Sequence, residues 1–137
     1  MYIEEYDQEV YIQFAKAVKG SRDAFRWLIE QKVPEWAAFS NAIRGDESAT
    51  HWLLRRGFPE LGVLANAIDD EPKAMRWINE YPDPFLYHFC QATKKDEVSK
   101  TWLKENNCLI FLMLAEKIRE TMLVRIKEET FWYRINF

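Results

Sequence analysis

The chain has 137 residues, with 30% charged and 48% hydrophobic residues, a composition typical of one globular domain with a sizeable core. Its net charge of −3 does not favour a nucleic-acid partner, because binding to a phosphate backbone usually requires a basic face. The acidic N-terminal stretch lacks the apolar region of a secretory signal, and the longest uncharged apolar run (108–115) is too short to span a bilayer. The two cysteines resemble buried thiols. We therefore expect a cytoplasmic protein without a membrane segment.

The first predicted element is a helix within residues 5–19, which carries apolar residues at helical spacing. From residue 20 onward the sequence repeats with a period of 25 residues, and this period predicts an array of one structural unit. Residues of different types keep this period, namely Trp27, Trp52, Trp77 and Trp102, then Ala17, Ala42, Ala67 and Ala92, and Pro34, Pro59 and Pro84.

Each unit is predicted to contain two short helices. In residues 45–69, Asp46 is a helix N-cap and Gly57 is a left-handed helix end, while Pro59 is suited to the first turn of the second helix. Helices of about 10 residues are not stable alone in water, so neighbouring units must cover one another. We expect the four tryptophans to be largely buried in equivalent sites.

The predicted organisation is a single domain over residues 1–137. A half-repeat or cap occupies 1–19, repeats occupy 20–44, 45–69, 70–94 and 95–119, and a C-terminal cap occupies 120–137. We expect residues 3–18 to cap one end of the array and residues 109–128 to cap the other. Residues 108–128 lack Gly and Pro and form either one long helix or two, whereas 131–137 are compatible with a strand, a turn or a tail.

The stretches LANAIDDEPKAMRWINEYPDP and FSNAIRGDESATHWLLRRG resemble the helix pairs of ankyrin repeats and, more distantly, tetratricopeptide arrays. The resemblance covers about residues 14–106. The period of 25 residues leaves no room for the ankyrin β-hairpin, whose repeat is 33 residues long, and the T-P-L-H signature is absent. The resemblance implies a stacked helical array with a concave binding surface. We therefore predict an all-α, short right-handed solenoid with helical caps.

Two columns of side chains are candidate binding surfaces. The first, here called the amide ribbon, should follow the second helices, and its amides are notable because Asn is unfavourable inside a helix. The second is a cationic face on the first helices. The simpler interpretation of both is hydrogen bonding to loops or ordinary solvation. The amide ribbon comprises Asn41, Asn66, Tyr87 and Gln91, and the cationic face comprises Arg26, His51 and Arg76.

No pattern indicates catalysis, a cofactor or a metal. His88 and Cys90 are too few for a metal site, which normally needs three or four ligands. His51 has no signalled nucleophile or orienting partner. The many carboxylates are placed at helix starts, where the helix dipole favours them.

The sequence thus predicts a non-enzymatic protein–protein interaction module, an adaptor or scaffold, with an unidentified protein partner. One alternative is a small-molecule or enzymatic groove near Tyr87, His88 and Gln91. Another is a regulatory or toxin-neutralising protein that binds its target through acidic residues.

Overall fold

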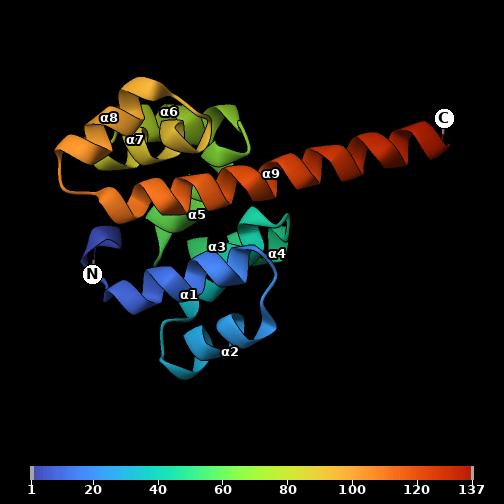
Figure 1. The fold of residues 1–137 in the computed structure, drawn as a ribbon, viewed down its shortest axis with the longest axis horizontal. Helices are drawn as coiled ribbons and strands as arrows, with labels where there is room; N and C mark the ends of the chain where they lie inside the picture. Colours follow the sequence, from blue (N-terminus) through green and yellow to red (C-terminus); the bar gives the residue numbers. More distant parts are fainter. Residues whose placement is uncertain (1, 137) are drawn as a thin grey trace.

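The structure, a computed structural model, describes residues 2–136. This range contains no strand, so the predicted all-α class is confirmed. Figure 1 shows the arrangement of the helices. In chain order the elements are a 3-10 turn, η1 (Ile3–Glu5), then α1 (Gln8–Val18), α2 (Arg22–Glu30), α3 (Pro34–Ile43), α4 (Glu47–Arg55), α5 (Pro59–Ile68), α6 (Pro72–Glu80), α7 (Pro84–Thr93), α8 (Glu97–Glu105) and α9 (Leu109–Asn136).

The helix boundaries follow the predicted punctuation. Helices α2, α4, α6 and α8 begin at residues 22, 47, 72 and 97, and a side chain caps the N-terminus of each. The chain takes a left-handed conformation at Gly57, as predicted. Left-handed residues also follow α1, α3, α5 and α7, where the chain must reverse direction; these are Gly20, Gly45, Asp70 and Lys95.

The helices form two sets, and we call α1, α3, α5, α7 and α9 the inner helices and α2, α4, α6 and α8 the outer helices. Successive inner helices pack against one another from α1 to α9, and α9 in turn packs against α1. Figure 1 shows α9 lying between α1 on one side and α7 and α8 on the other. The inner helices therefore form a closed cycle, and their facing side chains fill its centre.

The prediction that residues 3–18 and 109–128 cap opposite ends of the array is wrong, because α1 and α9 are neighbours. The Thr121 hydroxyl lies 3.2 Å from the Val18 carbonyl oxygen and 3.0 Å from the Lys117 carbonyl oxygen of its own helix. The Tyr11 and Phe111 rings meet edge to face at 5.0 Å. An ion pair between Lys19 and Glu120, with 2.9 Å between charged atoms, lies at the surface of the same contact. Both segments cover the same core from adjacent positions.

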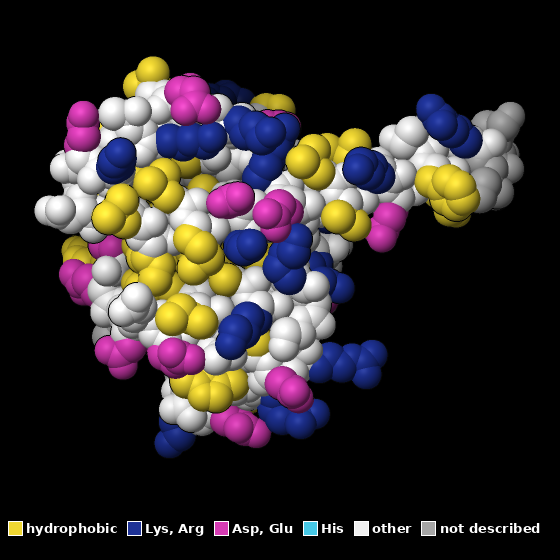
Figure 2. Space-filling model, in the orientation of Figure 1, with side chains coloured by type: hydrophobic (Ala, Val, Ile, Leu, Met, Phe, Trp, Pro, Cys, Tyr) yellow, Lys and Arg dark blue, Asp and Glu magenta, His cyan; other side chains and the backbone are white. Residues whose placement is uncertain are grey.

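Helix α9 is one continuous helix rather than two. The earlier inner helices end at left-handed residues such as Gly20 and Gly45, whereas the corresponding position here is Glu120, inside the helix. The sequence of residues 131–137 is compatible with a strand, a turn or a tail. The structure shows a helix as far as Asn136, and Phe137 lies outside the described residues. The last part of α9 projects from the body as an arm, as Figures 1 and 2 show.

The tryptophans are not largely buried, so that prediction is wrong. Trp27, Trp52 and Trp102 are half-buried, and Trp77 is 36% exposed. The residue after each tryptophan is fully buried instead, because it points directly at the inner helices. Three of the four rings stack on different partners: Trp52 on Phe58, Trp77 on Tyr81 and Trp102 on His88. The fully buried column is Leu28, Leu53, Ile78 and Leu103, each 0% exposed.

The surface on the side seen in Figure 2 has interspersed Lys, Arg, Asp and Glu side chains, with apolar ones between them. Within residues 2–136, no helix has both the length and the apolar character needed to cross a membrane.

The burial pattern predicts that the leucine column stabilises the fold more than the tryptophan column does. Replacing Leu53 with Ala should lower the free energy of unfolding by about 2–5 kcal/mol, because a fully buried side chain leaves a cavity. Trp52→Ala should lower it by less, since part of that ring is already in water. Urea denaturation of both variants measures the difference, and a larger effect for Trp52→Ala would contradict this assignment of the core.

The closed cycle predicts that two C-terminal truncations behave differently. Ending the chain after Glu128 preserves Thr121 and Arg125, whose guanidinium donates to the Ile43 carbonyl oxygen at 2.9 Å. This truncation should leave the melting temperature nearly unchanged. Ending the chain after Arg119 removes both contacts and exposes the apolar faces of α1 and α3, so it should lower the melting temperature and promote aggregation. Equal thermal stability of the two truncated chains would rule out the closure.

Candidate functional site

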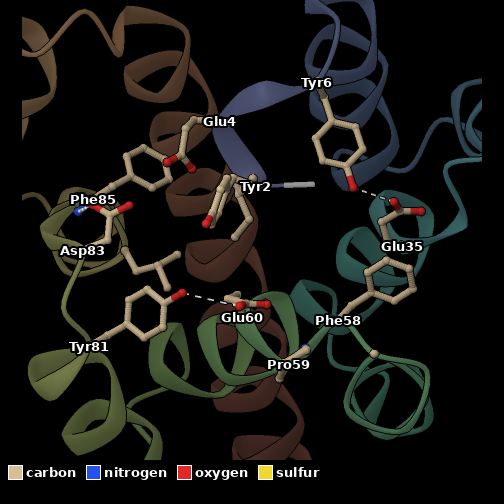
Figure 3. Close-up of a pocket in the computed structure, with 13 residues that line it drawn as sticks. Tyr2, Glu4, Tyr6, Glu35, Phe58, Pro59, Glu60, Tyr81, Asp83 and Phe85 are labelled. Atoms are coloured by element: carbon tan, nitrogen blue, oxygen red, sulfur yellow. Dashed lines mark hydrogen bonds between the residues drawn. The ribbon is translucent and has the colours of Figure 1, made fainter.

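A cavity of about 530 Å³ opens where α3, α5 and α7 begin, beside η1. Figure 3 shows its labelled residues converging from these elements. Its walls are mainly aromatic and acidic, and no Lys, Arg or His side chain contributes to them. The acidic and tyrosine residues of this acidic cavity are Glu4, Glu35, Glu60, Asp83, Tyr2, Tyr6 and Tyr81.

The inner helices place two of the carboxylates at equivalent positions. Pro34 and Pro59 begin α3 and α5, and Glu35 and Glu60 are the next residues, in the first turn of each helix. A negative charge is favourable there because the backbone amides of a helix N-terminus carry a partial positive charge. The corresponding residue of α7 is Phe85, but the preceding N-cap is Asp83, whose carboxylate accepts a hydrogen bond from the Phe85 amide. Three successive inner helices therefore direct acidic groups toward the cavity.

The turn before α7 differs from the turns before α3, α5 and α9, and this difference supplies one wall. The chain is left-handed at Lys32, Gly57 and Asn107 after the other outer helices. Pro82 occupies the corresponding position, and its ring restricts φ to negative values. The backbone is instead extended at Tyr81, whose ring stacks on Trp77 with centroids 4.8 Å apart. Tyr81 thus lies at the cavity, where its hydroxyl donates to Glu60 at 3.4 Å.

The N-terminal segment is held over the cavity by Tyr11 of α1. Its hydroxyl donates to the Ile3 carbonyl oxygen at 2.6 Å and accepts from the Tyr6 amide at 2.9 Å. Burial raises the pKa of Tyr11 to about 12, so it remains a neutral donor. This bridge fixes η1 and therefore positions both Glu4 and Tyr6.

The most enclosed carboxylate is Glu35, which is 7% exposed and accepts a hydrogen bond of 2.6 Å from the Tyr6 hydroxyl. The Tyr6 ring packs edge-on against Trp36, with centroids 5.4 Å apart. Burial, and then the hydrogen bond and negative charge of Glu35, raise the pKa of Tyr6 above its usual value. Tyr6 is therefore protonated at neutral pH and compensates part of the desolvation of Glu35.

On the opposite side of the cavity, Glu4 and Asp83 form a like-charged pair. Figure 3 shows the Glu4 side chain directed toward the side where Asp83 and Phe85 lie. Partial desolvation and the nearby charge of Asp83 raise the pKa of Glu4, while a backbone hydrogen bond opposes this rise. Among the described residues, none of the four cavity carboxylates has a basic partner within ion-pair distance. Within the described residues, no Lys, Arg or His therefore offsets the negative charge of this cavity.

The residues predicted as binding surfaces lie elsewhere. Tyr87 is 37% exposed, whereas Asn41, Asn66 and Gln91 are half-buried, and their side-chain amides make no hydrogen bond within the described chain. None of the four lines the acidic cavity. The residues of the cationic face, Arg26, His51 and Arg76, are all exposed on outer helices.

The alternative groove near His88 is occupied by packing interactions. The His88 ring stacks on Trp102 with centroids 4.5 Å apart, and its Nδ1 lies 2.9 Å from the Ser99 hydroxyl. Burial lowers the pKa of His88, which favours the neutral ring. Across residues 2–136, no group of three or more His, Cys, Asp or Glu side chains is arranged to hold a metal ion.

Sequence reasoning missed the acidic cavity, although two signals pointed to it. A glutamate directly follows a proline at both Glu35 and Glu60, and Tyr6 and Tyr81 stand in the same repeat column, three periods apart. We interpreted the carboxylates separately, as helix-start residues. Their convergence depends on the closed cycle, which the repeat pattern did not reveal.

A scan against protein-family models, a search of curated proteins and a search of solved structures each found nothing that matches this chain. Function is therefore inferred from the geometry of its own side chains.

The hydrogen bond to Glu35 makes Tyr6→Phe a sensitive test of the site. Without the hydroxyl, a carboxylate that is 7% exposed loses the one side-chain donor it has among the described residues, so the free energy of unfolding should fall by about 1–3 kcal/mol. Tyr2→Phe, a change in the same cavity at a residue that is 64% exposed, serves as the control and should have little effect. Urea denaturation measures both, and a neutral effect of Tyr6→Phe would show that water satisfies Glu35.

Proposed function

We propose that this chain is a non-catalytic protein-interaction module whose acidic cavity accepts basic side chains of a protein partner. The observation that carries the proposal is the set of four carboxylates in a cavity with tyrosine walls, whose described lining contains no Lys, Arg or His. A guanidinium or ammonium group would neutralise this charge, and aromatic faces add cation–π attraction. The proposal also covers the regulatory alternative, in which acidic residues bind a target. The target would then present an Arg- or Lys-bearing segment to the acidic cavity.

The architecture supports this proposal in a second way. A partner segment that enters the cavity would contact η1, α3, α5 and α7 together, so equivalent positions of successive repeats form one binding surface. We interpret the helix pairs as 25-residue repeats of a right-handed solenoid whose first and last inner helices meet. The proposed setting is the cytoplasm, and the partner is a protein rather than a nucleic acid.

The like-charged pair makes stability and binding separable. Asp83→Asn retains an oxygen that can cap α7 but removes one negative charge. The raised pKa of Glu4 means that its contribution to folding stability is greatest below pH 4.5 and is lost as the pH rises through the folded-state value. Asp83→Asn removes the charge next to Glu4 and should reduce this loss, so the variant should be at least as stable as the parent chain at pH 7. It should nevertheless bind a basic partner more weakly, because the cavity has lost one negative charge.

The test uses Glu60→Gln combined with Asp83→Asn, and a matched control, Glu47→Gln combined with Glu97→Gln. The control pair removes the same charge from exposed positions on α4 and α8. The probe is a fluorescent peptide with two arginines flanked by glycines, and its affinity is measured by anisotropy at two salt concentrations. We expect the cavity variant to bind about tenfold more weakly or worse, the control to bind like the parent chain, and added salt to weaken binding.

The same variants then serve as baits in an affinity pull-down with mass spectrometry to identify the natural partner. Equal peptide affinity of the cavity variant and its control would reject the acidic cavity as the binding site. In that case the combined replacement of Asn41, Asn66 and Gln91 by Ala tests the amide ribbon. That triple variant should retain its melting temperature, because its amides make no hydrogen bonds within the described chain, and partner capture should decrease only if the ribbon is the binding face.

A further inference from the structure

A second cavity, of about 500 Å³, has the opposite charge. It lies where α1 and α3 end and α2 begins, whereas the acidic cavity lies where α3, α5 and α7 begin. Its lining includes three arginines, Arg22, Arg26 and Arg44, and contains no carboxylate. Two side chains from the predicted binding surfaces, Arg26 and Asn41, meet here although they belong to different columns.

The three guanidinium groups lack acidic partners. Within the described residues, no ion pair involves Arg22, Arg26 or Arg44. Arg44 makes one long hydrogen bond, of 3.4 Å, to the Val18 carbonyl oxygen. Asp23, the acidic residue in the first turn of α2, does not line the cavity. Three exposed arginines therefore line one cavity, and none has an acidic partner among the described residues.

Folding alone does not account for Arg22. It is the first residue of α2, where the helix dipole disfavours a cation. The corresponding first residues of α4, α6 and α8 are Glu47, Pro72 and Glu97, which suit a helix start. Arg44 follows α3, and a cation is favourable at that helix end. Arg22 thus adds a charge that neither its own helix nor its neighbours require.

The rest of the lining combines an apolar surface with the polar residues Ser21 and Asn41. Phe25, Ala17 and Ile29 contribute to the apolar surface, and Ile29 is 46% exposed. The Asn41 amide, which has no hydrogen-bond partner within the described chain, is available to a ligand. An anionic group against the arginines and an apolar group against this surface would together match the cavity.

We propose that this cavity binds a small organic phosphate, with the phosphate on Arg22, Arg26 and Arg44 and an apolar or aromatic group on Phe25 and Ile29. A phosphate monoester carries about two negative charges at neutral pH and has three acceptor oxygens. Guanidinium groups bind such oxygens through paired hydrogen bonds. A carboxylate would neutralise only one of the three charges. This site is separate from the acidic cavity and does not depend on the function proposed for it.

The probes are phenyl phosphate, inorganic phosphate, benzoate and phenol, titrated at millimolar concentrations with binding followed by calorimetry. We expect phenyl phosphate to bind most tightly, inorganic phosphate and benzoate to bind more weakly, and phenol not to bind. Arg22→Ala combined with Arg26→Ala should weaken phenyl phosphate binding about tenfold or more. The matched control is Arg56→Ala combined with Arg76→Ala, which removes the same charge from exposed positions at the end of α4 and on α6 and should bind like the parent chain.

Ile29→Ala separates the two parts of the site. It should weaken phenyl phosphate while leaving inorganic phosphate unaffected, because only the first ligand reaches the apolar surface. The proposal is overturned if phenyl phosphate does not bind, if it binds equally to the Arg22/Arg26 variant and its control, or if inorganic phosphate binds as tightly as phenyl phosphate. Circular dichroism of each variant confirms that the fold is retained before binding is measured.

Discussion

The contact between α9 and α1 is the constraint on which the rest of this structure depends. Without it, the inner helices would form an open row, and the apolar faces of the first and last members would remain in water. With this contact, side chains such as Phe14, Phe89 and Leu114 are 0% exposed. They are fully buried even though the inner helices that precede α9 are short. Two polar contacts join α9 to the ends of α1 and α3. The Thr121 hydroxyl lies 3.2 Å from the Val18 carbonyl oxygen, and the Arg125 guanidinium donates to the Ile43 carbonyl oxygen.

Closure also determines where the charged groups gather. The N-terminal ends of α3, α5 and α7 lie around the same cavity, so carboxylates that would each stabilise a separate helix instead face a shared space. The hydroxyls of Tyr6 and Tyr81 donate hydrogen bonds to Glu35 and Glu60, but they supply no positive charge. The acidic cavity is therefore a direct result of local helix preferences combined with the closed arrangement.

The local elements could be predicted from the sequence, because their signals are local. Asp46 and Pro59 mark helix starts through a hydrogen bond and a fixed φ, and the 25-residue period places the corresponding elements in each repeat. The closure could not be predicted, because an array of helix pairs can be open or closed with the same apolar stripe. The exposure of Trp77 could not be predicted for a related reason. A large ring suggests burial, but its size does not reveal whether the helix position faces the inner helices or the rim. Both cavities depend on such relations between helices.

Helix dipoles explain most of the charge distribution, and the exceptions are informative. Glu35 and Glu60 lie at helix starts and Arg44 follows a helix end, so their positions require no ligand. Glu4 differs, because it lies in a single 3-10 turn and adds a negative charge beside Asp83. Arg22 differs as well, because it puts a cation at a helix start. Each exception increases the charge already present in its cavity, negative in one and positive in the other. The helix dipole explains neither placement, whereas a ligand of opposite charge would be stabilised by both.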